Sequence, residues 1–176
     1  GGLDGASFLN VRGEFIYMPT PRGVVVVNID NPTRPELVTE IPIAGARYVD
    51  HMFRYLFVTS DKGLHIVDVT EQTAPKIVPD AFIPLADAQN LHVARTYAYV
   101  AAGREGMAII DVKNPERPSV FKMETAGGKI TDARDIVVGS TNASLFAYVA
   151  DGVNGLKVLQ LTSPDLQPNF YGFSPA

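Results

Sequence analysis

The side chains best suited to binding chemistry follow four evenly spaced alanines. Ala6, Ala46, Ala88 and Ala133 recur at intervals of 40, 42 and 45 residues, and the pairs after them differ: Ser7-Phe8, Arg47-Tyr48, Gln89-Asn90 and Arg134-Asp135. Guanidinium and amide groups donate hydrogen bonds, and Arg pairs strongly with carboxylates and phosphates. If the four segments surround one axis, these side chains meet at its mouth and can hold an anionic group or a water network. In the alternative, they pair with one another and with nearby backbone, because buried polar groups need partners.

The predicted ligand- or partner-binding set adds one arginine from a neighbouring loop. Its members are Arg47, Gln89, Asn90, Arg104, Arg134 and Asp135.

Catalytic and metal-binding patterns are weak by comparison. The chain has no cysteine, which excludes disulfides, zinc-thiolate and iron–sulfur sites and covalent c-type haem on this chain. His51, His65 and His92 lack the spacing of metal ligands, and no serine lies in a G-x-S-x-G turn or near a histidine in sequence. Asp151-Gly152-Val153-Asn154-Gly155 lacks the ligand pattern of a calcium loop and is typical of a hairpin turn. We predict no catalytic residue and no metal site.

Composition limits the classes of partner. The 176 residues are 46% hydrophobic with a net charge of -4, and Lys and Arg are scattered singly. This distribution argues against nucleic-acid binding. The longest apolar stretch, around Gly23 to Ile29, is too short to cross a bilayer, so no membrane insertion is expected. The start at Gly1, without Met, is compatible with a processed or excised piece.

Four copies of one pattern must position these residues. An aromatic residue precedes a glycine by six or seven positions, and a proline follows the glycine by twelve or thirteen. The aromatic residues are Tyr17, Phe57, Tyr99 and Tyr148; the glycines are Gly23, Gly63, Gly106 and Gly155; the prolines are Pro35, Pro75, Pro118 and Pro168. Repetition at 40 to 49 residues predicts an array of equivalent units. We predict a single domain over 1–176, with repeats at about 6–45, 46–87, 88–132 and 133–176.

Each repeat divides into four short strands. In the third they are expected at 90–94, 97–101, 107–112 and 119–124, with Gly and Pro at the junctions. Near-continuous aliphatic third strands suit sheets that are covered on both faces, so the fold class is an all-β propeller of four-stranded antiparallel blades. Four blades either close on themselves or form part of a larger ring. Loops between blades, and turns between second and third strands, should share one face.

Two structural expectations follow from this pattern. Gly63, Gly106 and Gly155 should have unusual backbone angles or lie where backbones approach closely. The third-strand aliphatic side chains should be buried between blades; they are Val25, Val27, Ile66, Ile109, Ile110 and Val158.

The repeats resemble the LVIVD repeat, a unit named for its third strand. The resemblance is carried by YAYVAAGREGMAIIDVKNPERPSV, FAYVADGVNGLKVLQLTSPDLQP and YLFVTSDKGLHIVDVTEQTAP. FIYMPTPRGVVVVNIDNPTRP departs at the turn, where Pro19 and Pro21 replace the usual Ala-Asp. The resemblance covers about Ala6 to Pro175 and implies a bacterial or archaeal propeller. Proteins of this family are mostly exported or surface-attached, so an extracytoplasmic location, in the periplasm or at the cell surface, is expected.

Three functions remain open at this point. The favoured hypothesis is a non-catalytic scaffold that binds a protein partner, with no cofactor on this chain. The family resemblance implies an alternative, an accessory or fused domain of a multihaem cytochrome, with haem on the partner or fused domain. The third is a hydrolase or lyase acting at the mouth through Arg47, Arg134 and Asp135, so whether the chain is an enzyme stays open.

Overall fold

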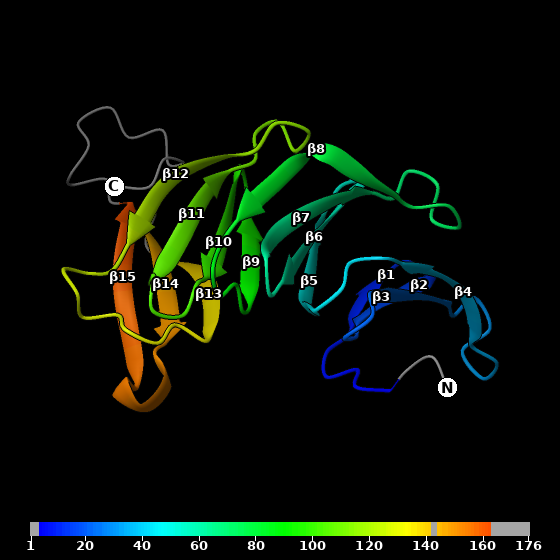
Figure 1. The fold of residues 1–176 in the computed structure, drawn as a ribbon, viewed down its shortest axis with the longest axis horizontal. Coiled ribbons are helices and arrows are strands. Elements are labelled where there is room, and N and C mark those ends of the chain that lie inside the picture. Colours follow the sequence, from blue (N-terminus) through cyan, green and yellow to red (C-terminus); the bar gives the residue numbers. More distant parts are fainter. Residues whose placement is uncertain (1–3, 142–143, 163–176) are drawn as a thin grey trace.

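The chain folds into four antiparallel β-sheets arranged as the blades of a propeller (Figure 1). The computed structural model describes residues 4–141 and 144–162. Blades 1 and 2 consist of β1 (Asn10–Arg12), β2 (Phe15–Pro19), β3 (Val24–Asn28), β4 (Glu36–Ile41), β5 (Ala46–Met52), β6 (Tyr55–Ser60), β7 (Gly63–Asp68) and β8 (Lys76–Pro84). Blades 3 and 4 consist of β9 (Leu91–Ala94), β10 (Tyr97–Ala101), β11 (Met107–Asp111), β12 (Ser119–Glu124), β13 (Asp135–Thr141), β14 (Ser144–Ala150) and β15 (Leu156–Thr162). The predicted all-β propeller is confirmed.

Every blade is a simple meander in which each strand pairs with the next. Blades 1 to 3 have four strands, and the described part of blade 4 has three. The fourth strand and Pro168 of the last repeat lie outside the described residues. The four strands expected in the third repeat are present to within one residue at their ends. No segment of 4–141 or 144–162 is a helix long and apolar enough to cross a membrane.

Burial on both faces explains the continuous apolar strands. Every residue of β10 is buried. Tyr97 and Tyr99 pack towards blade 4, whereas Ala98 and Val100 pack towards blade 2. Because successive side chains point to opposite faces of a strand, a strand between two neighbours needs apolar residues at every position.

Glycines and prolines occupy the turns as expected. Gly63, Gly106 and Gly155 have φ values of 144°, 83° and 77°, which confirms the prediction for all three. At Gly63 and Gly106 an added Cβ would also collide with a carbonyl oxygen of the fourth strand, from Ile83 and Glu124 respectively. The proline-bearing links close as tight turns, for example through the bond from Arg117 N to Asn114 O of 2.9 Å.

Consecutive blades share three apolar cores. One lies between blades 1 and 2, one between blades 2 and 3 and one between blades 3 and 4. Polar bonds between innermost strands add to this packing. His51 Nδ1 lies 2.8 Å from Asn10 Oδ1, and Val93 N donates to Asp50 Oδ2 at 2.8 Å. Each blade is therefore held mainly by its neighbours in sequence.

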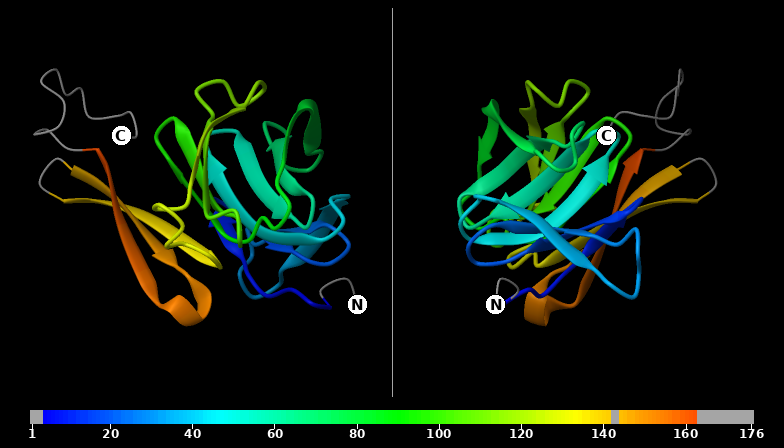
Figure 2. Two further views of the ribbon diagram at one scale, coloured as in Figure 1. Left: turned by 60° about the vertical axis from the view of Figure 1, so that its left-hand side comes forward. Right: turned by 90° about the vertical axis from the view of Figure 1, so that its right-hand side faces the viewer.

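The blades form an open arc, with the first and last at opposite ends (Figures 1 and 2). Strands β1, β5, β9 and β13 lie side by side in that order, but no comparable packing joins the described strands of blade 4 to those of blade 1. The prediction that all third-strand aliphatic residues are buried holds for Val25, Val27, Ile66, Ile109 and Ile110. It is wrong for Val158, which is 55% exposed because no blade follows it in the described structure.

Candidate binding site at the mouth of the blades

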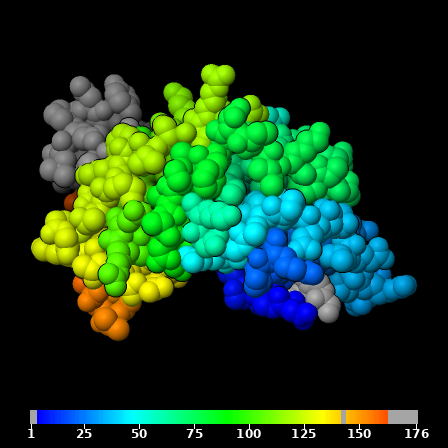
Figure 3. All heavy atoms as spheres, in the orientation of Figure 1, coloured from blue at the N-terminus to red at the C-terminus, as the bar shows by residue number. Residues whose placement is uncertain are grey.

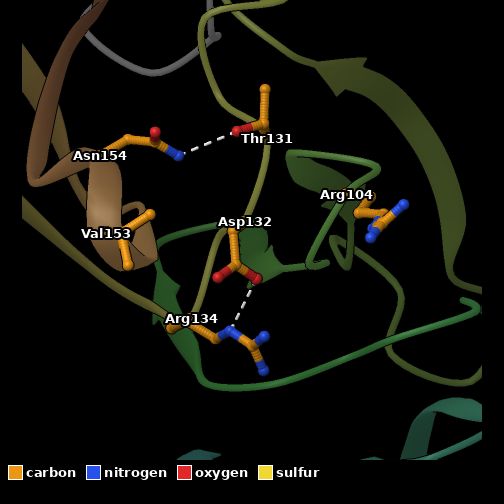
Figure 4. Close-up of a pocket in the computed structure, with 6 residues that line it drawn as sticks. All are labelled: Arg104, Thr131, Asp132, Arg134, Val153 and Asn154. Carbon is orange, nitrogen blue, oxygen red and sulfur yellow. Dashed lines mark hydrogen bonds and ion pairs between the residues drawn. The ribbon is translucent and has the colours of Figure 1, made fainter.

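The loops between blades and the turns between second and third strands lie on one face, which we call the mouth face. Figure 4 shows Arg104 from the β10–β11 turn beside Asp132 and Arg134 from the β12–β13 link. Asn154 from the β14–β15 turn joins them, and its Nδ2 donates to Thr131 Oγ1 at 2.9 Å. The expected grouping of these loops is confirmed, since residues from three loops line one hollow.

A pocket at the centre of this face collects four of the six predicted residues. It has a volume of about 500 Å³, and we call it the mouth pocket. Its lining residues are Gly5, Ser7, Phe8, Pro21, Ala46, Arg47, Tyr48, Gln89, Asn90 and Arg134. They come from all four repeats. Two arginines, one glutamine and one asparagine are among these residues, and no Asp or Glu is among the described residues that line the pocket.

Arg47 is held in place by the following blade. Its Nη1 donates to Asp87 Oδ1 at 2.7 Å and to Ala88 O at 2.9 Å. Gln89 Nε2 donates to the same carboxylate oxygen. Partial burial alone would raise the pKa of Asp87, but the hydrogen bonds from Arg47 and Gln89 outweigh it and hold the pKa below its usual value. Asp87 therefore stays ionised at neutral pH and orients both donors.

Arg134 lies between the mouth pocket and a second hollow. Its Nε pairs with Asp132 Oδ1 at 2.7 Å (Figure 4), and its positive charge also contributes to the lowered pKa of Asp87. The second hollow has a volume of about 580 Å³ and is also lined by Arg104. Arg134 can thus present its terminal N–H groups to a ligand in either space.

Two further predicted residues, Asn90 and Asp135, accept hydrogen bonds from backbone N–H groups. Asn90 Oδ1 accepts a hydrogen bond from Leu91 N at 2.6 Å, and Asp135 Oδ1 accepts one from Ile136 N at 2.7 Å. Asp135 does not line the mouth pocket. Burial, together with the charges of Asp50 and Asp135, raises the pKa of Tyr48. The two alternatives left open by the sequence are therefore both present: bonding to nearby backbone at Asn90 and Asp135, and an accessible cluster of donors around the arginines.

Sequence reasoning missed a repeated pairing of glycine and aspartate on this face. In blade 2, a Cβ on Gly45 would collide with the carboxylate of Asp61. In blades 3 and 4 the order is reversed: Asp87 fills the space beside Gly103, and Asp132 fills the space beside Gly152. Gly45, Asp87 and Asp132 each stand directly before an anchoring alanine, and this alignment was the available signal. Two of these aspartates orient the arginines of the site.

One serine and one histidine also meet without having been predicted. Ser60 Oγ lies 2.9 Å from His65 Nε2, although the sequence analysis found no serine near a histidine. Thr20, at the equivalent position in blade 1, bonds to Gly23 O just as Ser60 bonds to Gly63 O. Burial lowers the pKa of His65, with a further contribution from Lys62. Because Thr20 makes the same bond without a histidine, this pair closes a turn.

Aspartate 151 supports the last link between blades. It is buried, and its Oδ1 accepts hydrogen bonds from Thr131 N and Asp132 N at 2.9 and 2.6 Å. The segment after it is a short 3-10 turn, Gly152–Asn154, as expected for a hairpin. Over residues 4–141 and 144–162, no group of three acidic or histidine side chains is arranged to hold a metal ion.

Comparison with solved structures identifies the fold. The chain is similar to the computationally designed protein Ika4, with a TM-score of 0.65 and 9% identity over 92% of this chain and 94% of that one. It is also similar to a functionally unknown protein from Desulfotomaculum acetoxidans, with a TM-score of 0.61 and 12% identity over 86% of this chain and 54% of that one. Hsv2p of Kluyveromyces lactis matches with a TM-score of 0.51 and 15% identity over 91% of this chain and 47% of that one. The chain thus spans about half the length of the two natural proteins.

Family comparison extends this result to the sequence. No curated protein matches the chain. The model of the LVIVD repeat matches residues 5–41, 54–79, 86–123 and 131–165, which correspond to the four blades. Because these segments cover most of the sequence, the chain belongs to the LVIVD-repeat family.

Proposed function

We propose that this chain is a non-catalytic, exported interaction module whose mouth pocket receives a carboxylate-bearing group of a protein partner. The observation that carries the proposal is the pocket lining, in which Arg47, Arg134, Gln89 and Asn90 come together. The aspartates that orient the two arginines, Asp87 and Asp132, are not among the lining residues. A carboxylate can accept several hydrogen bonds and is bound well by planar guanidinium groups. The expected extracytoplasmic location is supported by the family resemblance.

Preorganisation favours binding at this place. Arg47 is fixed by Asp87 and Ala88, and Arg134 is fixed through Nε by Asp132. Side chains that are already ordered lose little conformational freedom when a ligand arrives. The stacked rings of Phe8 and Tyr48, with centroids 3.9 Å apart, form an apolar side of the same pocket. A partner residue with an aliphatic stem and a terminal carboxylate, such as Glu, suits this combination.

A pair of short peptides tests the proposal. One six-residue peptide carries a single central Glu and the other carries Gln at that position, with both ends blocked. We expect the Glu peptide to shift the NMR signals of the Arg Nε–H groups and of the Gln89 and Asn90 side-chain amides. The R134Q variant should weaken binding by about 10- to 150-fold, the effect of one hydrogen bond to a charged group. Its urea unfolding midpoint should change little, because Arg134 is half exposed.

The matched control is R34Q, on a proline-bearing turn away from the mouth face. It should bind the Glu peptide as the native chain does. Equal binding of the Glu and Gln peptides, or unchanged binding by R134Q, would contradict the proposal.

A further inference from the structure

The last blade exposes a face that is buried in every other blade. We call this the trailing face: Val137, Phe146, Tyr148, Leu156 and Val158. Tyr148 is 38% exposed, whereas its counterparts Tyr17, Phe57 and Tyr99 are almost completely buried. Leu156 and Val158 are 65% and 55% exposed, although Met107 and Ile109 at the same positions of blade 3 are buried. In blades 1 to 3 the equivalent face is covered by the opposite face of the next blade.

The first blade exposes that opposite face. We call it the leading face: Ala6, Leu9, Val11, Ile16 and Met18. Ala46, Ala88 and Ala133 are buried against the preceding blade, but Ala6 is exposed and Leu9 is half exposed. Val25 and Val27 on the same side are already buried, so the open part belongs to the two inner strands.

A hollow lies where a neighbouring aromatic ring would insert. It has a volume of about 450 Å³ and is lined by Ala6, Ser7, Phe8, Leu9 and Met18. In the three internal interfaces, the aromatic residue of β2, β6 or β10 belongs to the same core as the alanine that starts the next blade. By this equivalence, Tyr148 is the ring that fits beside Ala6.

We propose that the trailing face of one copy of this chain packs on the leading face of a second copy, and that two such contacts close a ring. Each copy carries both complementary faces at opposite ends of an open arc, as Figure 3 shows for the first and last blades. The contact continues the interfaces already present between blades 1 and 2, 2 and 3, and 3 and 4. It is a head-to-tail contact, which closes only when the geometry of the two arcs allows it.

The chemistry of the two faces also favours this occupant. Contiguous apolar surface on a soluble protein marks an interaction site. The defining residues of both faces are apolar, and the polar residues on the same side of blade 4, Asp135 and Gln160, lie at the ends of the strands β13 and β15. A second copy supplies the required alanine, leucine and valine pattern without any other partner. The two faces contain none of the arginine and amide side chains of the mouth pocket, so this inference does not depend on the proposed function.

Molecular mass in solution tests the proposal. Interfaces of standard size have dissociation constants from the µM to the pM range. Size-exclusion chromatography with light scattering at about 5 to 200 µM chain should therefore give twice the 19.0 kDa mass of the chain. V158D on the trailing face and L9D on the leading face should each weaken association at least about tenfold, because each buries a charge without a partner. V120D is the matched control: Val120 is also an exposed strand valine, but it lies on the outer strand of blade 3. It should leave the mass unchanged.

Mixing the two interface variants distinguishes a head-to-tail contact from a contact between two identical faces. V158D keeps a native leading face and L9D keeps a native trailing face, so an equimolar mixture should form a heterodimer through one intact contact. A contact between two trailing faces would instead leave L9D fully dimeric, and this result would overturn the proposal. A native chain that stays monomeric at 200 µM, or that forms open polymers of more than two copies, would overturn it as well. Circular dichroism of each variant confirms that the blades remain folded.

Discussion

Ile109 and Val158 occupy the same position of the repeat and have opposite environments. Both are third-strand residues whose strands pair with a Tyr-containing second strand, at Tyr99 and Tyr148. Ile109 is 1% exposed within the core between blades 3 and 4, whereas Val158 is open on the trailing face. The difference shows that the repeat specifies a blade with two apolar faces. Whether a given face is buried depends on the presence of a neighbouring blade.

Alanine substitution at these two positions should give the largest contrast. I109A should lower the free energy of unfolding by about 2 to 5 kcal/mol, because it removes buried methylene groups and leaves a cavity. V158A should cost under about 0.5 kcal/mol in dilute solution, where its side chain is exposed. Urea denaturation of both variants at the same low chain concentration provides the measurement. Similar losses for the two would show that blade 4 is covered even in the single chain.

Glycine substitution sharpens the same comparison in the turns. G106A should destabilise the chain by about 1 to 3 kcal/mol, because Gly106 has a positive φ and its added Cβ would meet Glu124 O. G155A has a similar positive φ but open space around it, so it should cost about 1 kcal/mol. Denaturation midpoints can be compared directly. A larger loss in G155A would mean that crowding in blade 4 exceeds that in blade 3.

Alkaline pH probes the buried aromatic residue of blade 3. Burial raises the pKa of Tyr99 well above its usual value of 10, with a smaller contribution from Tyr97. The folded protein then holds this proton more tightly than the unfolded chain, so the stabilisation is complete below pH 10 and is lost as the pH rises above it. At pH 10.5 the loss due to one such tyrosine is about 1 kcal/mol. Y99F should reduce the stability difference between pH 7 and pH 10.5 by this amount, and an unchanged difference would contradict the burial of the hydroxyl.

The blades were predictable because each local signal repeats four times. Aromatic, glycine and proline residues at fixed spacing indicate strands and turns, and each repeat reinforces the others. Exposure at the ends was not predictable, because Val158 has the same type and spacing as buried residues and only the order of blades in space distinguishes it. The structure places four of the residues that follow the alanines, Arg47, Gln89, Asn90 and Arg134, around one pocket, and their role in binding stays a prediction.

The part of the site that sequence reasoning missed depends on local geometry. Asp87 and Asp132 look like ordinary loop residues, and their roles follow from the bonds that they make with Arg47 and Arg134. Asp135 belonged to the predicted set by position, but its carboxylate turns towards its own backbone. The position of a residue at the start of a strand therefore predicts where the residue lies in the fold. It does not predict the direction in which the side chain points.

The paired glycines and aspartates have a consequence for how such repeats diversify. In blades 2 to 4, the link before the blade and the turn between its second and third strands enclose a space that holds only one side chain. An aspartate from one or the other of these two loops fills that space. The two positions are therefore not independent: gaining an acid in one loop requires losing the side chain in the other. By this exchange, a repeat can carry its aspartate on one loop of the mouth face or on the other. The number of these aspartates per blade and the path of the backbone stay the same. Binding specificity at the mouth face can thus vary between blades without a change in strand spacing.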